Sequence, residues 1–226
     1  MKRAPIFKLL EVMARLRSPK GGCPWDLEQD HMTLRAYAVE EVYELLDAIE
    51  AGDDHEMVEE LGDLLLQVVF HCQMARERGA FDFDQVCQHI VEKLIRRHPH
   101  VFDTKNIKTA EAVLKQWDQI KKAEKQGTRH ERPSMLDGIP KHLPALLKAE
   151  KLAKKARKAG LVEKGARKKS QSKQAMGEEL FALAQTAQQQ GWSAETLLRA
   201  EVKRREQQWR RMEKRKGGDK SGGRNH

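Results

Sequence analysis

Apolar residues recur at helical spacing along almost the whole chain, and this pattern limits the possible folds more than any other feature. The opening segment shows it with Ile6, Leu9, Leu10, Met13 and Leu16. Residues spaced i, i+3 and i+4 share one face of a helix, so each such segment can bury an apolar stripe. The sequence contains no alternating strand pattern of any length. We therefore expect an all-α fold, built as a helical bundle.

Proline, glycine and turn residues divide this pattern into separate helices. The segment RSPKGGCPWD, residues 17–26, is rich in Pro and Gly and is expected to be a loop. We expect Asp26 to cap the helix that follows it. Helices are predicted at about 33–49, 57–78, 83–98 and 109–125, with the turn AGDDH between the first two and Pro99 at the end of the third.

The charge of the chain is divided unevenly. Residues 1–128 hold 18 Lys and Arg against 23 Asp and Glu, a net charge of −5. Residues 129–226 hold 25 Lys and Arg against 11 Asp and Glu, a net charge of +14. Such an asymmetry indicates two units with different roles. We place a first domain at 1–125, a linker at 126–134, a second domain at 135–216 and a disordered basic tail at 217–226.

Four acidic residues form two pairs on consecutive predicted helices. Glu41 and Glu44 lie one turn apart beside an apolar face, and Glu60 and Asp63 repeat this layout on the next helix. If the AGDDH turn folds the two helices antiparallel, both apolar faces enter one core and both pairs meet at its edge. Carboxylates so close together repel each other. A divalent cation relieves the repulsion, and oxygen ligands without His or Cys favour Mg²⁺ or Mn²⁺ over Zn²⁺.

A solvated acidic helix surface is the ordinary alternative for any single pair. The second half of the chain argues against it here, because residues 174–194 echo residues 59–81 but keep only one acid of the motif, Glu178 in place of Asp63. Ala175 stands where the first copy has Glu60, and Gln207–Gln208 stand where it has Arg96–Arg97. The copy keeps its apolar spacing, so the acids are not required to form the helices. We expect an internal duplication whose second copy is truncated and degenerate.

The acidic motif resembles that of the MazG-type nucleoside triphosphate pyrophosphohydrolases. EExxE at 40–44, fifteen intervening residues, and ExxD at 60–63 agree with that family in order and spacing, as do GGCPWD, RRHPHVF and WxxIK within residues 5–125. The resemblance extends to two-domain members, although the second domain here lacks the motif. A smaller departure is Asp30, where a Thr is expected before His31, and it leaves the substrate preference open.

The resemblance implies an activity and a set of ligands. The reaction is hydrolysis of NTPs and dNTPs to the monophosphate and pyrophosphate, a housecleaning activity on the nucleotide pool, with Mg²⁺ (or Mn²⁺) as cofactor. The implied Mg²⁺ ligands are Glu41, Glu44, Glu60 and Asp63. Glu40 is expected either to activate water as a general base or to support a ligand from behind.

Basic and aromatic residues are candidates for binding the substrate. Lys93, Arg96 and Arg97 share one helix face and suit phosphate, although positive charge near a helix C-terminus is favourable by itself. Lys121 is a weaker candidate of the same kind. Trp25 could stack on a base, or close a small core instead. The same two roles are open to Trp117.

The remaining expectations concern partners and location. We see no signal-peptide core and no apolar run long enough for a membrane span, so we expect a cytoplasmic protein without a membrane partner. The family tends to be dimeric and short helices need partners to bury their faces, so we expect a homodimer. The alternative function is a nucleic-acid-binding or regulatory protein acting through the basic half. Basic helices with interspersed Glu are usually solvated faces, so nucleic acid is the less favoured partner.

Overall fold

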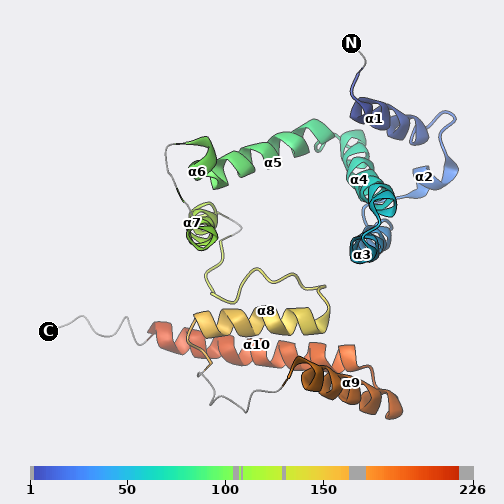
Figure 1. Ribbon diagram of the computed structural model, residues 1–226. Helices are drawn as coiled ribbons and strands as arrows, with labels where there is room; N and C mark the ends of the chain where they lie inside the picture. The colour runs from blue at the N-terminus through green and yellow to red at the C-terminus, as the bar shows by residue number, and fades with distance from the viewer. Residues whose placement is uncertain (1–2, 104–106, 108, 129–130, 163–171, 219–226) are drawn as a thin grey trace. The chain divides into compact units, whose positions relative to one another are not determined.

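The computed structural model describes residues 3–103, 107, 109–128, 131–162 and 172–218. These residues form helices, turns and irregular segments without a strand, so the all-α prediction is confirmed for them (Figure 1). The chain divides into two units, Met1–Val113 and Leu114–His226, a division that falls within a helix before the predicted linker. In the described part of the chain, each helix is too short or too polar to cross a membrane.

The helices follow the predicted segments closely. The first unit holds α1 (Pro5–Leu16), α2 (Pro24–Glu28), α3 (Arg35–Ala51), α4 (Asp54–Glu77), α5 (Phe83–Arg97) and α6 (Pro99–Phe102). Helix α7 (Ala110–Ala123) crosses the division, and the second unit continues with α8 (Ala145–Lys158), α9 (Lys173–Gln189) and α10 (Ala194–Gly218). Residues 129–130 of the predicted linker and 219–226 of the predicted tail lie outside the described residues.

The turn between α3 and α4 sets the geometry of the acidic site. Gly52 ends α3 with a φ of 69°, a left-handed conformation that glycine adopts without a steric penalty. The Asp53 carboxylate then caps α4 by accepting hydrogen bonds from the backbone N–H groups of His55 (2.8 Å) and Glu56 (3.2 Å). So short a connection returns α4 along α3, and the predicted helical hairpin is confirmed.

The contacts between α3 and α4 show that the two helices are antiparallel, because residues earlier in the chain on the α3 side meet residues later in α4. Glu41 of α3 accepts a hydrogen bond from Gln67 of α4. Ten residues before Glu41, His31 contacts His71, which lies further along α4. The acidic pairs of the two helices therefore lie at the same height along the axis of the hairpin.

The core of the first unit lies at the second half of α4. Its fully buried members come from α1, from the turn before α3 and from α4: Met13, Leu34, Val69, Phe70 and Met74. Phe83, at the start of α5, packs against the same cluster. These contacts anchor the beginning of α5, and α5 then leads away from the end of α4 (Figure 1).

Two local predictions are wrong. Residues 17–26 are not loop throughout, because Pro24 begins α2, and proline favours the first position of a helix. Asp26 lies buried inside that helix and caps nothing. The turn before α3 is held instead by Asp30, whose carboxylate accepts from the backbone N–H groups of Met32 (2.6 Å) and Thr33 (2.8 Å).

The expectation that both apolar faces of the hairpin enter one core is also wrong for the single chain. Val42 on α3 and Leu61 and Leu65 on α4 are exposed, Leu61 at 49%. Two helices alone bury only the narrow seam between them, and a wider apolar face needs a third layer. Since α5 leads away from α4, it does not supply that layer (Figure 1).

The second unit is organised along α10. Leu152 and Ala156 of α8 and Val202 of α10 are buried together in a separate core. Glu195 accepts from the backbone N–H of Ala145 at 2.9 Å, which fixes the start of α8. Some basic residues of α10 pair with acids one turn away, as Glu201 shows by pairing with Arg204 and Arg205 of the same helix.

Candidate metal centre

Three of the four predicted ligands converge. Glu41 of α3 and Glu60 and Asp63 of α4 each offer a carboxylate oxygen, and these oxygens lie within 4.8 Å of one another. All three residues are partly buried at the edge of the hairpin. Among the described residues this is the only group of three acidic, His or Cys side chains with such spacing. Hard, charged oxygen donors of this kind suit a small divalent cation.

The carboxylates of this group repel one another. Burial raises the pKa of Glu41, and the negative charges of Asp63, Glu44 and Glu40 raise it further. Burial also raises the pKa of Glu60, with Glu44 the largest of the neighbouring charges. Each carboxylate therefore makes its neighbours harder to ionise, and a bound cation would remove that penalty.

The other two acids of the motif lie beside this group rather than in it. Glu44 is exposed and does not join the three converging oxygens, although its charge acts on both Glu41 and Glu60. Glu40 is exposed as well, and its charge acts on Glu41. Both charges therefore add to the negative potential at the site.

The sequence analysis missed Gln67, which contacts the group directly. Its side chain is 8% exposed and its Nε2 donates a hydrogen bond to Glu41 Oε1 at 3.2 Å. This bond opposes the rise in the pKa of Glu41 that burial causes. The available signal was an amide inside the otherwise apolar run LLLQVVF, one helical turn after Asp63.

A second polar contact holds the start of α3 against α4. The rings of His31 and His71 stack with centroids 5.0 Å apart, and their Nδ1 atoms lie 2.8 Å from each other. Burial lowers the pKa of His71, and His31 lowers it further, so His71 is neutral at pH 7. One imidazole then donates to the other, and the turn that precedes the acidic helix is fixed in place.

Trp25 belongs to an aromatic cluster next to the acidic group. Its ring meets Tyr37 edge-on at 5.8 Å and Phe70 edge-on at 6.4 Å. Phe70 is buried, whereas Trp25 and Tyr37 are partly open to solvent. Tyr37 precedes Glu41 by one helical turn, so the cluster adjoins the acidic group.

The predicted phosphate-binding cations are not gathered at the acids within one chain. Lys93, Arg96 and Arg97 lie on the second half of α5, which starts at the opposite end of α4 from Glu60. Asp63 and the end of α4 are about 20 Å apart along the helix, at 1.5 Å per residue. The reason is the exit direction of α5, which no local pattern in the sequence specifies.

The two remaining candidates belong to the second unit. Trp117 and Lys121 lie on α7, where the Lys121 Nζ is 5.5 Å from the centroid of the Trp117 ring. This is a cation–π contact of ordinary length. Whether these residues meet the substrate stays a prediction.

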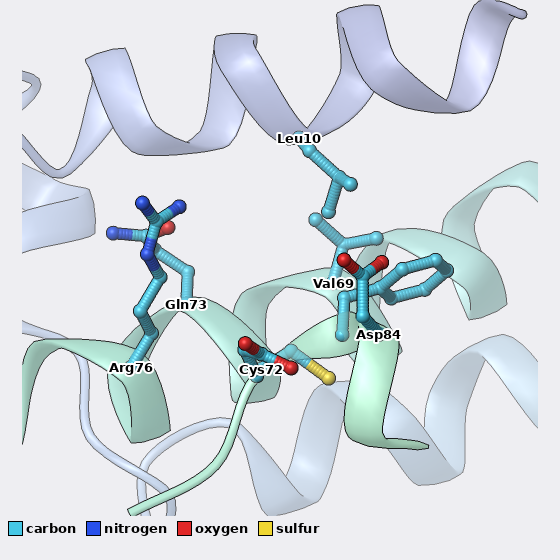
Figure 2. Close-up of a pocket in the computed structure, with 8 residues that line it drawn as sticks. Leu10, Val69, Cys72, Gln73, Arg76 and Asp84 are labelled. Carbon is cyan, nitrogen blue, oxygen red and sulfur yellow. The ribbon is translucent and has the colours of Figure 1, made fainter. Parts of the chain in front are cut away.

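A cavity of about 240 Å³ lies at the second half of α4 (Figure 2), on a later stretch of that helix than Glu60 and Asp63. Leu10, Val69 and Phe83 supply its apolar lining, and Arg76 stands beside Gln73 at one side of it. The cavity marks the seam where α1, α4 and α5 meet. None of the predicted ligands lines it, so the acidic group is a separate site.

Comparison with known proteins agrees with this geometry. The MazG nucleotide pyrophosphohydrolase domain matches residues 29–102, which include the whole acidic group and Gln67. A nucleoside triphosphate pyrophosphohydrolase of Escherichia coli (strain K12) is 49% identical over 156 residues, covering 69% of this chain and 58% of that protein. The chain therefore spans less than two thirds of that relative.

Two further relatives extend the comparison. A nucleoside triphosphate pyrophosphohydrolase/pyrophosphatase MazG of Thermotoga maritima is 45% identical over 162 residues, covering 71% of this chain and 60% of that protein. An uncharacterized 26.1 kDa protein of Streptomyces cacaoi is 43% identical over 199 residues, and the match covers 87% of this chain and 78% of that protein. The similarity thus extends past the acidic motif into the second unit.

Proposed function

Because this chain belongs to the MazG nucleotide pyrophosphohydrolase family, we propose that it hydrolyses nucleoside triphosphates, ribo or deoxy, to the monophosphate and pyrophosphate. The convergence of Glu41, Glu60 and Asp63 is the observation that carries the proposal. Two relatives that match more than 150 residues of this chain carry the name nucleoside triphosphate pyrophosphohydrolase. The protein would act on the nucleotide pool.

The cofactor in this proposal is Mg²⁺, with Mn²⁺ as a substitute. Glu41, Glu60 and Asp63 would hold it, and Glu44, one turn from Glu41, would complete the set. When bound, the cation would neutralise phosphate charge and acidify water at the site. All four donors are carboxylates, which is the ligand chemistry that Mg²⁺ prefers.

Side chains of the protein would activate the water and bind the phosphates. Glu40 is exposed and its charge acts on Glu41, so it would orient a water molecule or accept its proton. Attack at the α-phosphorus would release pyrophosphate as the leaving group. Lys93, Arg96 and Arg97 would bind the phosphates through charge-assisted hydrogen bonds.

The base of the nucleotide would meet an aromatic side chain. Trp25 is held edge-on by two neighbouring rings and keeps part of its surface open, as a stacking platform requires. Trp117 of α7 is the second candidate for the same role, and Lys121, whose Nζ lies 5.5 Å from the centroid of the Trp117 ring, would add a cation for the phosphates.

A second copy of the chain would complete the site. Helices α3, α4 and α5 leave many large apolar side chains exposed, and a contiguous exposed apolar surface commonly marks an interface. The faces of α3 and α4 border the acidic group, and covering all three with a partner would bury them in one bundle. The phosphate-binding cations of α5 stand apart from the acids of their own chain, so in a homodimer they would serve the partner's acids.

The second unit would support the enzyme without catalysing the reaction. Its described residues contain no group of three converging acids, and Ala175 occupies the position equivalent to Glu60. One acid of the motif is too few to hold Mg²⁺ productively. Its separate core shows that it can fold, and stabilising the chain or its dimer is the proposed role.

The test is Mg²⁺-dependent pyrophosphate release from a mixed nucleotide pool by the full chain. Chromatography of the ATP reaction should show AMP and pyrophosphate. The double variant Glu60→Ala, Asp63→Ala should lose turnover while its circular dichroism stays helical. A matched double variant, Glu50→Ala, Asp54→Ala, removes two acids of the same hairpin outside the site and should keep turnover.

Two outcomes would contradict the proposal. Full activity in the Glu60→Ala, Asp63→Ala variant would show that the converging acids are not the site. Formation of ADP and orthophosphate would show a cut between the β and γ phosphates, which is a different reaction.

A further inference from the structure

We propose that Gln67 is a positioning residue for the metal centre, which holds the Glu41 carboxylate in the orientation that binds the cation. The proposal rests on the proposed function, because it takes the acidic group as a metal site. Gln67 would touch neither the cation nor the substrate. Its action would be exerted through Glu41 alone.

The placement of Gln67 gives it this access. It follows Asp63 by one helical turn, so both side chains project from the same face of α4 toward α3. Glu41, across the hairpin, lies within reach of both. Asp63 and Glu60 approach the Glu41 carboxylate as charges, and Gln67 approaches it as a hydrogen-bond donor.

The orientation of the amide follows from chemistry. A carboxylate only accepts hydrogen bonds, so the Gln67 Nε2 rather than its Oε1 must face Glu41. The Nε2 donates to Glu41 Oε1 at 3.2 Å and leaves the other oxygen of Glu41 for a ligand. The hydrogen bond also ties the Glu41 carboxylate to α4, on the side of the hairpin where Glu60 and Asp63 lie.

The same placement is costly for stability, which argues against a purely structural role. Gln67 is 8% exposed, and its Oε1 is buried without a hydrogen-bond partner among the described residues. Its neighbours in the run from Leu64 to Phe70 are apolar, and an apolar side chain would avoid that penalty. Positions that break a local rule in this way are expected at functional sites.

The experiment measures metal binding without substrate. Mn²⁺ is titrated into the full-length chain, and free Mn²⁺ is followed by its electron paramagnetic resonance signal. Gln67→Met keeps the length of the side chain and removes the donor, and Gln67→Leu is the second variant. The matched control is Gln73→Met on the same helix, because Gln73 donates to Glu77 at 3.0 Å in the same manner but away from the acids.

Both Gln67 variants should bind Mn²⁺ with a dissociation constant about 10-fold to 100-fold higher than the wild type, the usual effect of losing a partner of a metal ligand. The Gln73 variant should stay within about twofold of the wild type, because it lies outside that shell. In turnover assays the Gln67 variants should need more Mg²⁺ for half-maximal rate, and excess Mg²⁺ should restore the rate.

Three outcomes bear on the inference differently. Folded Gln67 variants that bind Mn²⁺ like the wild type would overturn it and leave the proposed function intact. Loss of helical circular dichroism in both variants would overturn it as well, by making Gln67 a residue of the fold. Failure of the wild type to bind Mn²⁺ would instead refute the metal site, and with it the proposed function.

Discussion

Arg17 joins the opening segment of the first unit to the end of α4, and its removal should unfold that unit more easily. Its side chain is 9% exposed and forms a forked ion pair with Glu77, with Nε–Oε1 and Nη2–Oε2 distances of 2.8 and 2.7 Å. The guanidinium also donates to the carbonyl groups of Asp26 and Gln29 and lies 5.4 Å from the centre of the Phe70 ring. One cation therefore satisfies several acceptors at once.

The expected magnitude follows from these contacts. Arg17→Met keeps most of the apolar stem and removes the charge. Breaking one partner of a buried ion pair costs about 3 to 5 kcal/mol. Glu77 is 34% exposed and water can partly resolvate it, so we expect a loss at the lower end, about 3 kcal/mol. For a unit of this size that is roughly a 10 °C fall in Tm.

Urea and thermal unfolding followed by circular dichroism measure this loss. The control is Arg3→Met, because the Arg3–Glu11 pair is exposed on both sides and should contribute less than about 0.5 kcal/mol. The ion pair with Arg17 holds the pKa of Glu77 below its usual value. Its contribution is therefore present above the unfolded pKa of about 4.5 and is lost as the pH falls through the folded value.

The stability gap between wild type and Arg17→Met should consequently shrink between pH 7 and pH 3. An Arg17→Met variant within 1 kcal/mol of the wild type at pH 7 would refute the reasoning. So would a gap that stays constant as the pH falls, because Glu77 would then not be the partner that matters.

Three other changes test other parts of the structure. Glu60→Gln should raise the Tm of the metal-free protein by an amount that grows as the pH rises from 4.5 towards 7, because the raised folded pKa of Glu60 makes its ionisation costly. A Tm difference between variant and wild type that does not change with pH in EDTA would contradict this. Leu65→Lys should shift the chain towards monomer in sedimentation equilibrium, with exposed Lys154→Ala in the second unit as the neutral control. A chain ending at Gly127 should lose stability or assembly, while its folded fraction still hydrolyses nucleoside triphosphate. Hydrolysis by an isolated 135–226 fragment would show that the wrong half is taken as the enzyme.

The sequence by itself determined the helices and the acidic motif. The segments around α3, α4 and α5 were placed within a few residues, because their boundaries depend on Gly52, Asp53 and Pro99, which act on their own neighbours. Glu41, Glu60 and Asp63 were identified as a group because a short turn between two helices leaves few alternatives to antiparallel pairing. Resemblance to a known family supplied the reaction.

Only the tertiary structure decided which side chains meet across the helices. Gln67 with Glu41, His31 with His71 and the fork of Arg17 all join residues at least nine positions apart. The direction of α5 likewise separates the predicted phosphate-binding cations from the acids and leaves the apolar faces open. A repeating sequence pattern indicates which face of a helix is apolar. The depth and register at which two such faces pack depend on interlocking side chains and on the direction of each connection. Both are set only when the whole chain is folded.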